Sequence, residues 1–176
     1  MTFSRLLASQ LGNPSGITGK FAAFVWNRRN AALNDAVIDM LDLEPDDRVL
    51  EIGFGGGYLL DRMSTIVKDG LLVGVDVSSA MVTHCKNRFR KRIREGKLEL
   101  KRAAAESLPY PSGNFNKVCS TNSIFYWQDV GQAMSEIVRV LRPGAIWCCV
   151  LPIKNHWRRK FSQGLSGWLK PTKSRC

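Results

Sequence analysis

The residues best suited to chemistry lie in one glycine-rich stretch, "VLEIGFGGGYLL", at residues 49–60. A single acid, Glu51, precedes four closely spaced glycines, which are Gly53, Gly55, Gly56 and Gly57. Glycine permits positive φ angles and lets a ligand lie directly against the backbone. A simple strand-to-helix turn would need only one or two glycines, so the stretch predicts a ligand-binding loop.

The spacing in this loop narrows the class of ligand. The dinucleotide fingerprint G-x-G-x-x-G would need glycine where the chain has Tyr58, and no Gly-Lys-Ser/Thr follows as in a phosphate-binding loop. The carboxylate of Glu51, two residues before the first glycine, would repel a pyrophosphate and attract a positive charge. A ligand that carries positive charge is therefore favoured.

A second acid, Asp76, closes the next apolar run, "LLVGVD". An acid about 20 residues beyond a glycine loop accepts hydrogen bonds from ribose hydroxyls. Both NAD and S-adenosylmethionine contain a ribose, so Asp76 does not distinguish them. Val77 and Met81 follow and could form an apolar platform for an adenine, although methionine at this spacing is also typical of a core.

These residues require elements that bring them together, and short apolar runs alternate with helical patterns along the chain. Buried strands are expected at 48–53, 71–77, 97–102, 116–123 and 145–152. Helices are expected at 31–43, 58–67, 78–93 and 130–141, with Ser78 or Ser79 as the N-cap of the third. The alternation predicts a doubly wound α/β fold with a mainly parallel sheet, which binds ligands beyond the carboxyl ends of its strands.

Four segments, taken in order, resemble the motifs of class I S-adenosylmethionine-dependent methyltransferases. They are "VLEIGFGGG", "VGVDVSSAM", "AAAESLPYPSGNFNKVCSTNSIFYW" and "EIVRVLRPGA", within roughly residues 31–151. The resemblance implies a Rossmann-like core that binds S-adenosyl-L-methionine and yields S-adenosyl-L-homocysteine. The implied reaction is an in-line displacement in which a small-molecule acceptor takes the methyl group. Because sulfonium is already a good leaving group, the protein mainly positions the two reactants.

The resemblance also implies a set of cofactor-binding residues. They are Glu51, Gly53, Gly55, Gly57, Asp76, Val77, Met81, Ala105, Glu106 and Asn122. The first four would surround the methionine portion, Asp76 would hold the ribose, and Val77 and Met81 would flank the adenine. Ala105 and Glu106 would lie near the adenine edge, and Asn122 would line the cleft floor. Tyr126 and Trp127 are substrate-side candidates by position, and no catalytic residue is assigned.

The chain departs from the family pattern in three ways. Ala104 stands where relatives commonly have an acid for the adenine amino group, and Asn116 stands where the fourth strand often has aspartate. After the fifth strand the family fold normally continues with a helix and an antiparallel strand pair, whereas residues 153–176 show no strand alternation. We therefore expect a sheet without its C-terminal antiparallel strand pair, and a substrate cleft that a partner chain, such as a second copy, would complete.

One domain is expected, with a helical cap over residues 1–44, an S-adenosylmethionine-binding core over 45–152 and a basic tail over 153–176. Trp26, Asn27 and Asn30 of the cap are candidate cleft contacts. The tail carries only positive charge. It could contact a nucleic acid or an anionic membrane, but we favour an ending unrelated to the family.

Composition limits the other classes of function. The net charge of +11 is concentrated in residues 86–102 and in the tail, and the first of these segments fits an amphipathic helix with a solvated basic face. Nucleic-acid binding is disfavoured because the interleaved aromatics expected for base stacking are missing. The five cysteines form no CxxC pair, so we expect reduced thiols and no metal site. No apolar run is long enough to span a bilayer and no signal peptide is visible, so a cytoplasmic location is the default expectation.

The leading hypothesis is a methyltransferase that uses S-adenosylmethionine and acts on a small molecule. The alternative is a non-catalytic or truncated methyltransferase-like protein that binds the cofactor and associates through its basic tail. A nucleic-acid methyltransferase is the third hypothesis. It would be expected to have an Asn-Pro-Pro-Tyr/Phe type motif where this chain has "NSIF", residues 122–125.

Overall fold

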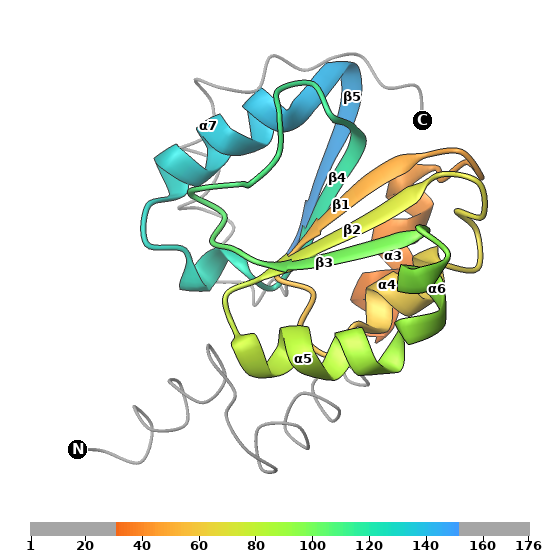
Figure 1. Cartoon of the computed structure of the whole chain (residues 1–176). Coiled ribbons are helices and arrows are strands. Elements are labelled where there is room, and N and C mark those ends of the chain that lie inside the picture. The colour runs from red at the N-terminus through yellow and green to blue at the C-terminus, as the bar shows by residue number, and fades with distance from the viewer. Residues whose placement is uncertain (1–30, 152–176) are drawn as a thin grey trace.

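The computed structural model describes residues 31–151, so Trp26, Asn27, Asn30 and the basic tail lie outside the described residues. Within this range one five-stranded sheet has the order β3-β2-β1-β4-β5, and every pairing is parallel (Figure 1). The strands are β1 (Arg48–Ile52), β2 (Leu71–Asp76), β3 (Leu98–Arg102), β4 (Phe115–Thr121) and β5 (Leu141–Val150). The predicted doubly wound α/β fold is confirmed, and no antiparallel strand pair occurs in residues 31–151, as expected. The division into cap, core and tail stays a prediction.

Five α-helices and one 3-10 helix accompany these strands in the described range. They are α3 (Ala31–Leu41), α4 (Tyr58–Met63), α5 (Ser79–Arg88), α6 (Arg90–Arg94), η1 (Ile124–Tyr126) and α7 (Val130–Val140). The predicted helix over 58–67 ends at Met63, where the hydroxyls of Ser64 and Thr65 donate to the carbonyls three residues earlier. Such side-chain bonds compete with continuation of the helix.

The predicted helix over 78–93 is divided at Phe89, whose backbone angles (φ −100°, ψ 21°) are not helical. The ring of Phe89 lies against Gly57 of the glycine loop. Phe89 is buried, Ile93 packs against the core, and Arg90 and Arg94 are exposed. The expected solvated basic face is therefore confirmed.

The last strand also differs from its prediction, because β5 begins at Leu141 instead of residue 145. Its register with β4 shifts between the Phe115–Leu141 and Lys117–Ile146 pairs. This irregularity accommodates Pro143 and Gly144, which lie between the single Phe115–Leu141 pair and the continuous pairing from Ile146 to Val150.

The two faces of the sheet are covered by different elements (Figure 1). Val49 and Leu72 share a core with residues of α3, α4 and α5, whereas Leu50 and Val73 share one with residues of α7. Side chains alternate between the faces of a strand, so Glu51 lies on the same face as Val49. Its carboxyl group is thereby directed toward α4 and α5.

The strand order reverses between β1 and β4, because the chain builds β2 and β3 on one side of β1 and then crosses to the other side. Ligands of open parallel sheets bind beyond the carboxyl ends of the strands at such a switch point. The topology therefore gathers the glycine loop, the residues after β2 and the segment after β4 at one edge of the molecule.

Lys117 of β4 attaches α3 to the sheet. Its Nζ donates to the carbonyls of Leu41 (2.6 Å) and Asp42 (2.8 Å), which end the helix. The Lys117 side chain is only 12% exposed, so few water molecules can replace it. A cation at a helix C-terminus satisfies the last carbonyls and interacts favourably with the helix dipole.

We predict that Lys117→Met lowers the free energy of unfolding by about 1–3 kcal/mol, because the carbonyls at the end of α3 lose a charged donor. Urea denaturation would measure this change. Lys68→Met, at an exposed position, is the matched control and should shift the free energy by less than about 0.5 kcal/mol. Equal midpoints for the two variants would show that Lys117 does not stabilise α3.

Candidate functional site

The glycine loop joins β1 to α4 in a conformation that β2 holds in place. Gly53 donates its N–H to the carbonyl of Val75 (2.8 Å), and Gly55 donates its N–H to Oδ2 of Asp76 (2.8 Å). Gly57 closes the turn by donating to the carbonyl of Phe54 (2.8 Å). The loop is therefore fixed to the carboxyl end of the neighbouring strand.

Helix α5 holds the same loop through side chains. Arg88 donates from Nη1 to the carbonyl of Gly56 (3.0 Å) and from Nη2 to Asp61 of α4 (2.7 Å), and Sγ of Cys85 lies 3.4 Å from the carbonyl of Gly55. The sequence analysis did not single out Arg88 or Cys85. The only sequence feature that could have indicated their contact with the loop is their spacing of three residues on the helix that follows Asp76.

The glycines differ in what surrounds them. A Cβ atom at Gly53 would lie 2.5 Å from Cβ of Ser123, and one at Gly57 would lie 2.7 Å from Cε2 of Phe89. A Cβ atom at Gly55 would meet nothing within 4 Å. Gly53 and Gly57 thus permit close packing, whereas Gly55 faces open space in which a ligand could lie against the backbone.

Glu51 lies beneath this loop and is only 3% exposed. Its Oε2 has no hydrogen-bond partner among residues 31–151. The pKa of the carboxyl group is raised to about 8, chiefly by burial and also by the nearby charge of Asp76, while a hydrogen bond from the Leu60 backbone opposes the rise. No positively charged side chain of the described range contributes to this shift, so the site fits a cation supplied by a ligand.

Asp76 has both carboxylate oxygens engaged, Oδ1 with the N–H of Ser78 (2.8 Å) and Oδ2 with the N–H of Gly55. Burial raises its pKa, and these two hydrogen bonds oppose the rise. Each carboxylate oxygen can accept a second bond, so ribose hydroxyls could still be bound. Ser78 also accepts from the N–H of Met81 (3.4 Å), which confirms it as the N-cap of α5.

The two predicted adenine contacts are in different environments. Val77 is 46% exposed, directly after β2, whereas Met81 is 2% exposed and belongs to the core between the sheet and α5. Only Val77 is therefore exposed to a ligand, because Met81 is covered by the core.

The segment after β4 approaches the glycine loop from the other side of the switch point. Oγ of Ser123 donates to the carbonyl of Ile52 (3.2 Å). Asn122 adopts φ +59°, and both polar atoms of its amide are buried without a partner in the described part of the chain. Tyr126 is 48% exposed, and Trp127 packs partly buried against the core beneath α7.

The loop after β3 carries the remaining predicted residues. Ala105 is buried in the α7 core, and the Glu106 carboxylate accepts the N–H groups of Gln128 (2.6 Å) and Asp129 (3.2 Å). Asn116 lies at the opposite end of the sheet, where it bonds to Asp47 and to the N–H of Arg48. The departure from aspartate at this position therefore falls outside the site.

Within residues 31–151, no three His, Cys, Asp or Glu side chains are grouped so that they could hold a metal ion. None of the helices in this range has the length and apolar character needed to cross a membrane. The strand cysteines Cys119 and Cys148 are buried and Cys149 is half-buried, and all three thiols are free.

Comparisons with known proteins identify what this arrangement resembles. A family model described as "Methyltransferase domain" matches residues 50–149. The chain is 32% identical to an uncharacterized methyltransferase, YdaC, of Bacillus subtilis (strain 168), over 70% of this chain and 66% of that protein. It is 33% identical to the 27-O-demethylrifamycin SV methyltransferase of Amycolatopsis mediterranei (strain S699), over 64% of this chain and 41% of that protein.

Among solved structures, the [4+2]-cyclase SpnF superposes with a TM-score of 0.62 at 28% sequence identity. The match covers 69% of this chain and 44% of the cyclase chain. The chain thus spans about two thirds of the length of one of these three proteins and less than half of the other two.

We predict that Gly55→Ala leaves the fold intact but weakens binding of S-adenosylmethionine at least about tenfold, a loss of about 1.4 kcal/mol, because the new methyl group occupies the ligand's space. Its positive φ alone should cost about 1–2 kcal/mol of stability. Calorimetric titration and urea denaturation would measure the two effects.

Gly53→Ala is the matched comparison. It adds a clash with Ser123 to a φ of +78°, so it should lower the free energy of unfolding by about 2–4 kcal/mol. Unchanged S-adenosylmethionine affinity in Gly55→Ala would show that the ligand does not pass this position.

Proposed function

Because the chain belongs to the methyltransferase-domain family, we propose that it binds S-adenosylmethionine at the glycine loop and transfers the methyl group to a small-molecule acceptor. The predicted class I family and its cofactor are confirmed by the family match. The acceptor is our inference, as are a cytoplasmic location and any completion of the cleft by a second copy.

The observation that carries this proposal is the buried, partnerless carboxyl oxygen of Glu51 beneath the open backbone of Gly55. S-adenosylmethionine carries a sulfonium and an α-ammonium group, and either would stabilise the ionised carboxyl group across a medium of low dielectric constant. A neutral or phosphorylated nucleoside would not.

Other residues would hold the remaining parts of the cofactor. Asp76 would accept hydrogen bonds from the ribose, and Val77 would lie against the adenine, with Met81 supporting it from the core. Ala105 would lie near the adenine edge. The amide of Asn122, which can both donate and accept, would line the cleft floor between cofactor and acceptor.

When bound, the cofactor supplies a methyl group on sulfur that an acceptor nucleophile can displace in line. The chain's own contribution is to orient the two molecules and to exclude water. We assign no general base among the described residues.

Three observations support a small-molecule acceptor. Phe125 and Tyr126 are exposed near the switch point and would suit an acceptor with an apolar face, and the rifamycin-modifying relative is named for such a molecule. Residues 31–151 contain as many acidic as basic residues, so the core carries no net positive charge, although its basic residues are concentrated in 86–102.

A second candidate function is cofactor binding without methyl transfer. The similarity to SpnF supports it, because that protein, 28% identical to this chain, is named as a cyclase and not as a methyltransferase. The nucleic-acid methyltransferase stays the third hypothesis.

We predict that S-adenosylmethionine and S-adenosylhomocysteine both bind the wild-type chain in calorimetric titrations. Asp76→Ala should abolish binding, because it removes the ribose acceptor and releases the N–H of Gly55. Asp69→Ala, at an exposed position, is the control and should bind normally. No heat with either compound would refute the proposal. Binding without label transfer from methyl-labelled cofactor to any component of a small-molecule extract would favour the second candidate.

We also predict that affinity for S-adenosylmethionine rises with pH up to about pH 8 and then levels off. The free carboxyl group of Glu51 keeps its proton below that pH, and a bound cation favours the ionised form, so binding releases a proton. The rise should approach about tenfold per pH unit.

The raised pKa of Glu51 has the opposite effect on the stability of the ligand-free protein. Stability should fall as pH increases from 4.5 toward 8.

Glu51→Gln is the test of this assignment, because its amide has nearly the same shape and cannot ionise. Its affinity for S-adenosylmethionine should lack the rise with pH, and calorimetry in buffers of different ionisation enthalpy should detect no proton release. A wild-type affinity that is flat from pH 6 to pH 8 would contradict the role of Glu51 without contradicting cofactor binding.

A further inference from the structure

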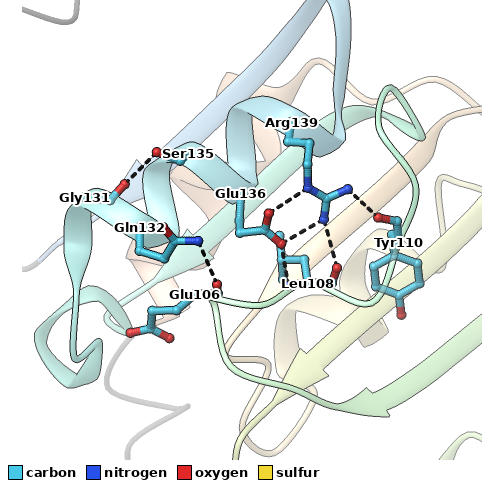
Figure 2. A network of polar contacts seen from close by, with 8 residues as sticks. All are labelled: Glu106, Leu108, Tyr110, Gly131, Gln132, Ser135, Glu136 and Arg139. Atoms are coloured by element: carbon cyan, nitrogen blue, oxygen red, sulfur yellow. Dashed lines mark hydrogen bonds and ion pairs between the residues drawn. The ribbon is translucent and has the colours of Figure 1, made fainter.

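Arg139 and Glu136 of α7 hold the loop between β3 and β4 by its backbone (Figure 2). Arg139 donates to the carbonyls of Leu108 (2.9 Å) and Tyr110 (2.7 Å), and Glu136 accepts the N–H of Leu108 (2.8 Å). The hydrogen bond between the two side chains lowers the pKa of Glu136. This part of the loop is therefore fixed to α7 independently of the Glu106 side chain.

Glu106 connects the same loop to the segment after β4. Its Oε1 accepts the N–H groups of Gln128 (2.6 Å) and Asp129 (3.2 Å), while its carbonyl accepts from Nε2 of Gln132 (3.4 Å). Figure 2 shows the Glu106 side chain directed away from the Arg139 contacts. Asp129 is the N-cap of α7. The Glu106 carboxylate, which accepts its N–H, therefore also lies at the positive end of that helix.

The segment 122–129 is consequently held at both ends. Ser123 fixes its start by packing against Gly53 and bonding to Ile52, and Glu106 fixes its end. Between these anchors lie the exposed side chains of Phe125 (54%) and Tyr126 (48%). Their position therefore depends on where Glu106 holds the backbone of residues 128 and 129.

We propose that Glu106 is a positioning residue that acts through this segment and does not contact the adenine. It fixes Phe125 and Tyr126 against the methyl acceptor, which is a small molecule with an apolar or aromatic face. The acceptor part of this inference rests on the proposed function. The carboxylate is suited to the task because its bonds to two N–H groups are charge-assisted and therefore strong.

The test compares Glu106→Ala with Glu106→Gln, which keeps an oxygen acceptor. In Glu106→Ala, amide hydrogen exchange over residues 124–129 should rise about tenfold or more as the anchored end opens. The fluorine resonance of Trp127, in protein labelled with fluorotryptophan and assigned with Trp127→Phe, should shift and broaden. The dissociation constant for S-adenosylmethionine should stay within about twofold of wild type. Glu106→Gln should restore both the exchange and the resonance.

Glu95→Ala, at the exposed residue that follows α6, is the control and should change none of these quantities. The inference is overturned if Glu106→Ala weakens S-adenosylmethionine binding tenfold while the Trp127 resonance stays in place, or if Glu106→Gln restores neither measurement. Failure of wild-type protein to bind S-adenosylmethionine would refute the proposed function. The exchange and fluorine measurements would still decide whether Glu106 anchors the segment.

Discussion

A carboxyl group buried without a partner of opposite charge is unfavourable, and the site is arranged around one such group, Glu51. Among the described residues, Asp76, Cys85 and Cys119 interact electrostatically with this carboxyl group, and none of them can neutralise it. An apolar side chain could pack at this position, as Val49 does two residues earlier on the same face of β1. The acid therefore lowers the stability of the empty protein, and a cation bound at the glycine loop would recover that loss.

The two sides of the switch point are stabilised in different ways. At the glycine loop, Asp76 and Arg88 hold the backbone through hydrogen bonds, so little conformational entropy remains to be lost when a ligand binds. On the other side, the chain after β4 is shaped by contacts with the β3–β4 loop and with α7. Under the proposed function the acceptor would lie on this second side, so a different acceptor could be accommodated there without altering the glycine loop.

The sequence predicted the features that depend on neighbouring residues, and it did not predict those that depend on contacts between residues far apart in the chain. The glycine loop, Asp76 and the Ser78 cap are local patterns, and each is found where it was expected. The break at Phe89 depends on a ring that packs against Gly57, and the bond from Glu106 to Gln128 joins residues 22 positions apart. Neither partner carries a local signal, so only the tertiary arrangement reveals that the Glu106 carboxylate holds the backbone of Gln128.

Asn122 combines two costs that a purely structural residue would avoid. Glycine would adopt its φ of +59° without strain, and a residue lacking the amide would not leave two buried polar atoms without partners in the described structure. Asparagine tolerates the left-handed conformation better than most residues, which limits the first cost but not the second. Asn122 follows β4 directly, beside Ser123, which packs against Gly53 of the glycine loop, so under the proposed function its amide would lie between cofactor and acceptor. Methyl transfer from a sulfonium needs orientation more than proton transfer, and a fixed group that both donates and accepts hydrogen bonds can supply that orientation.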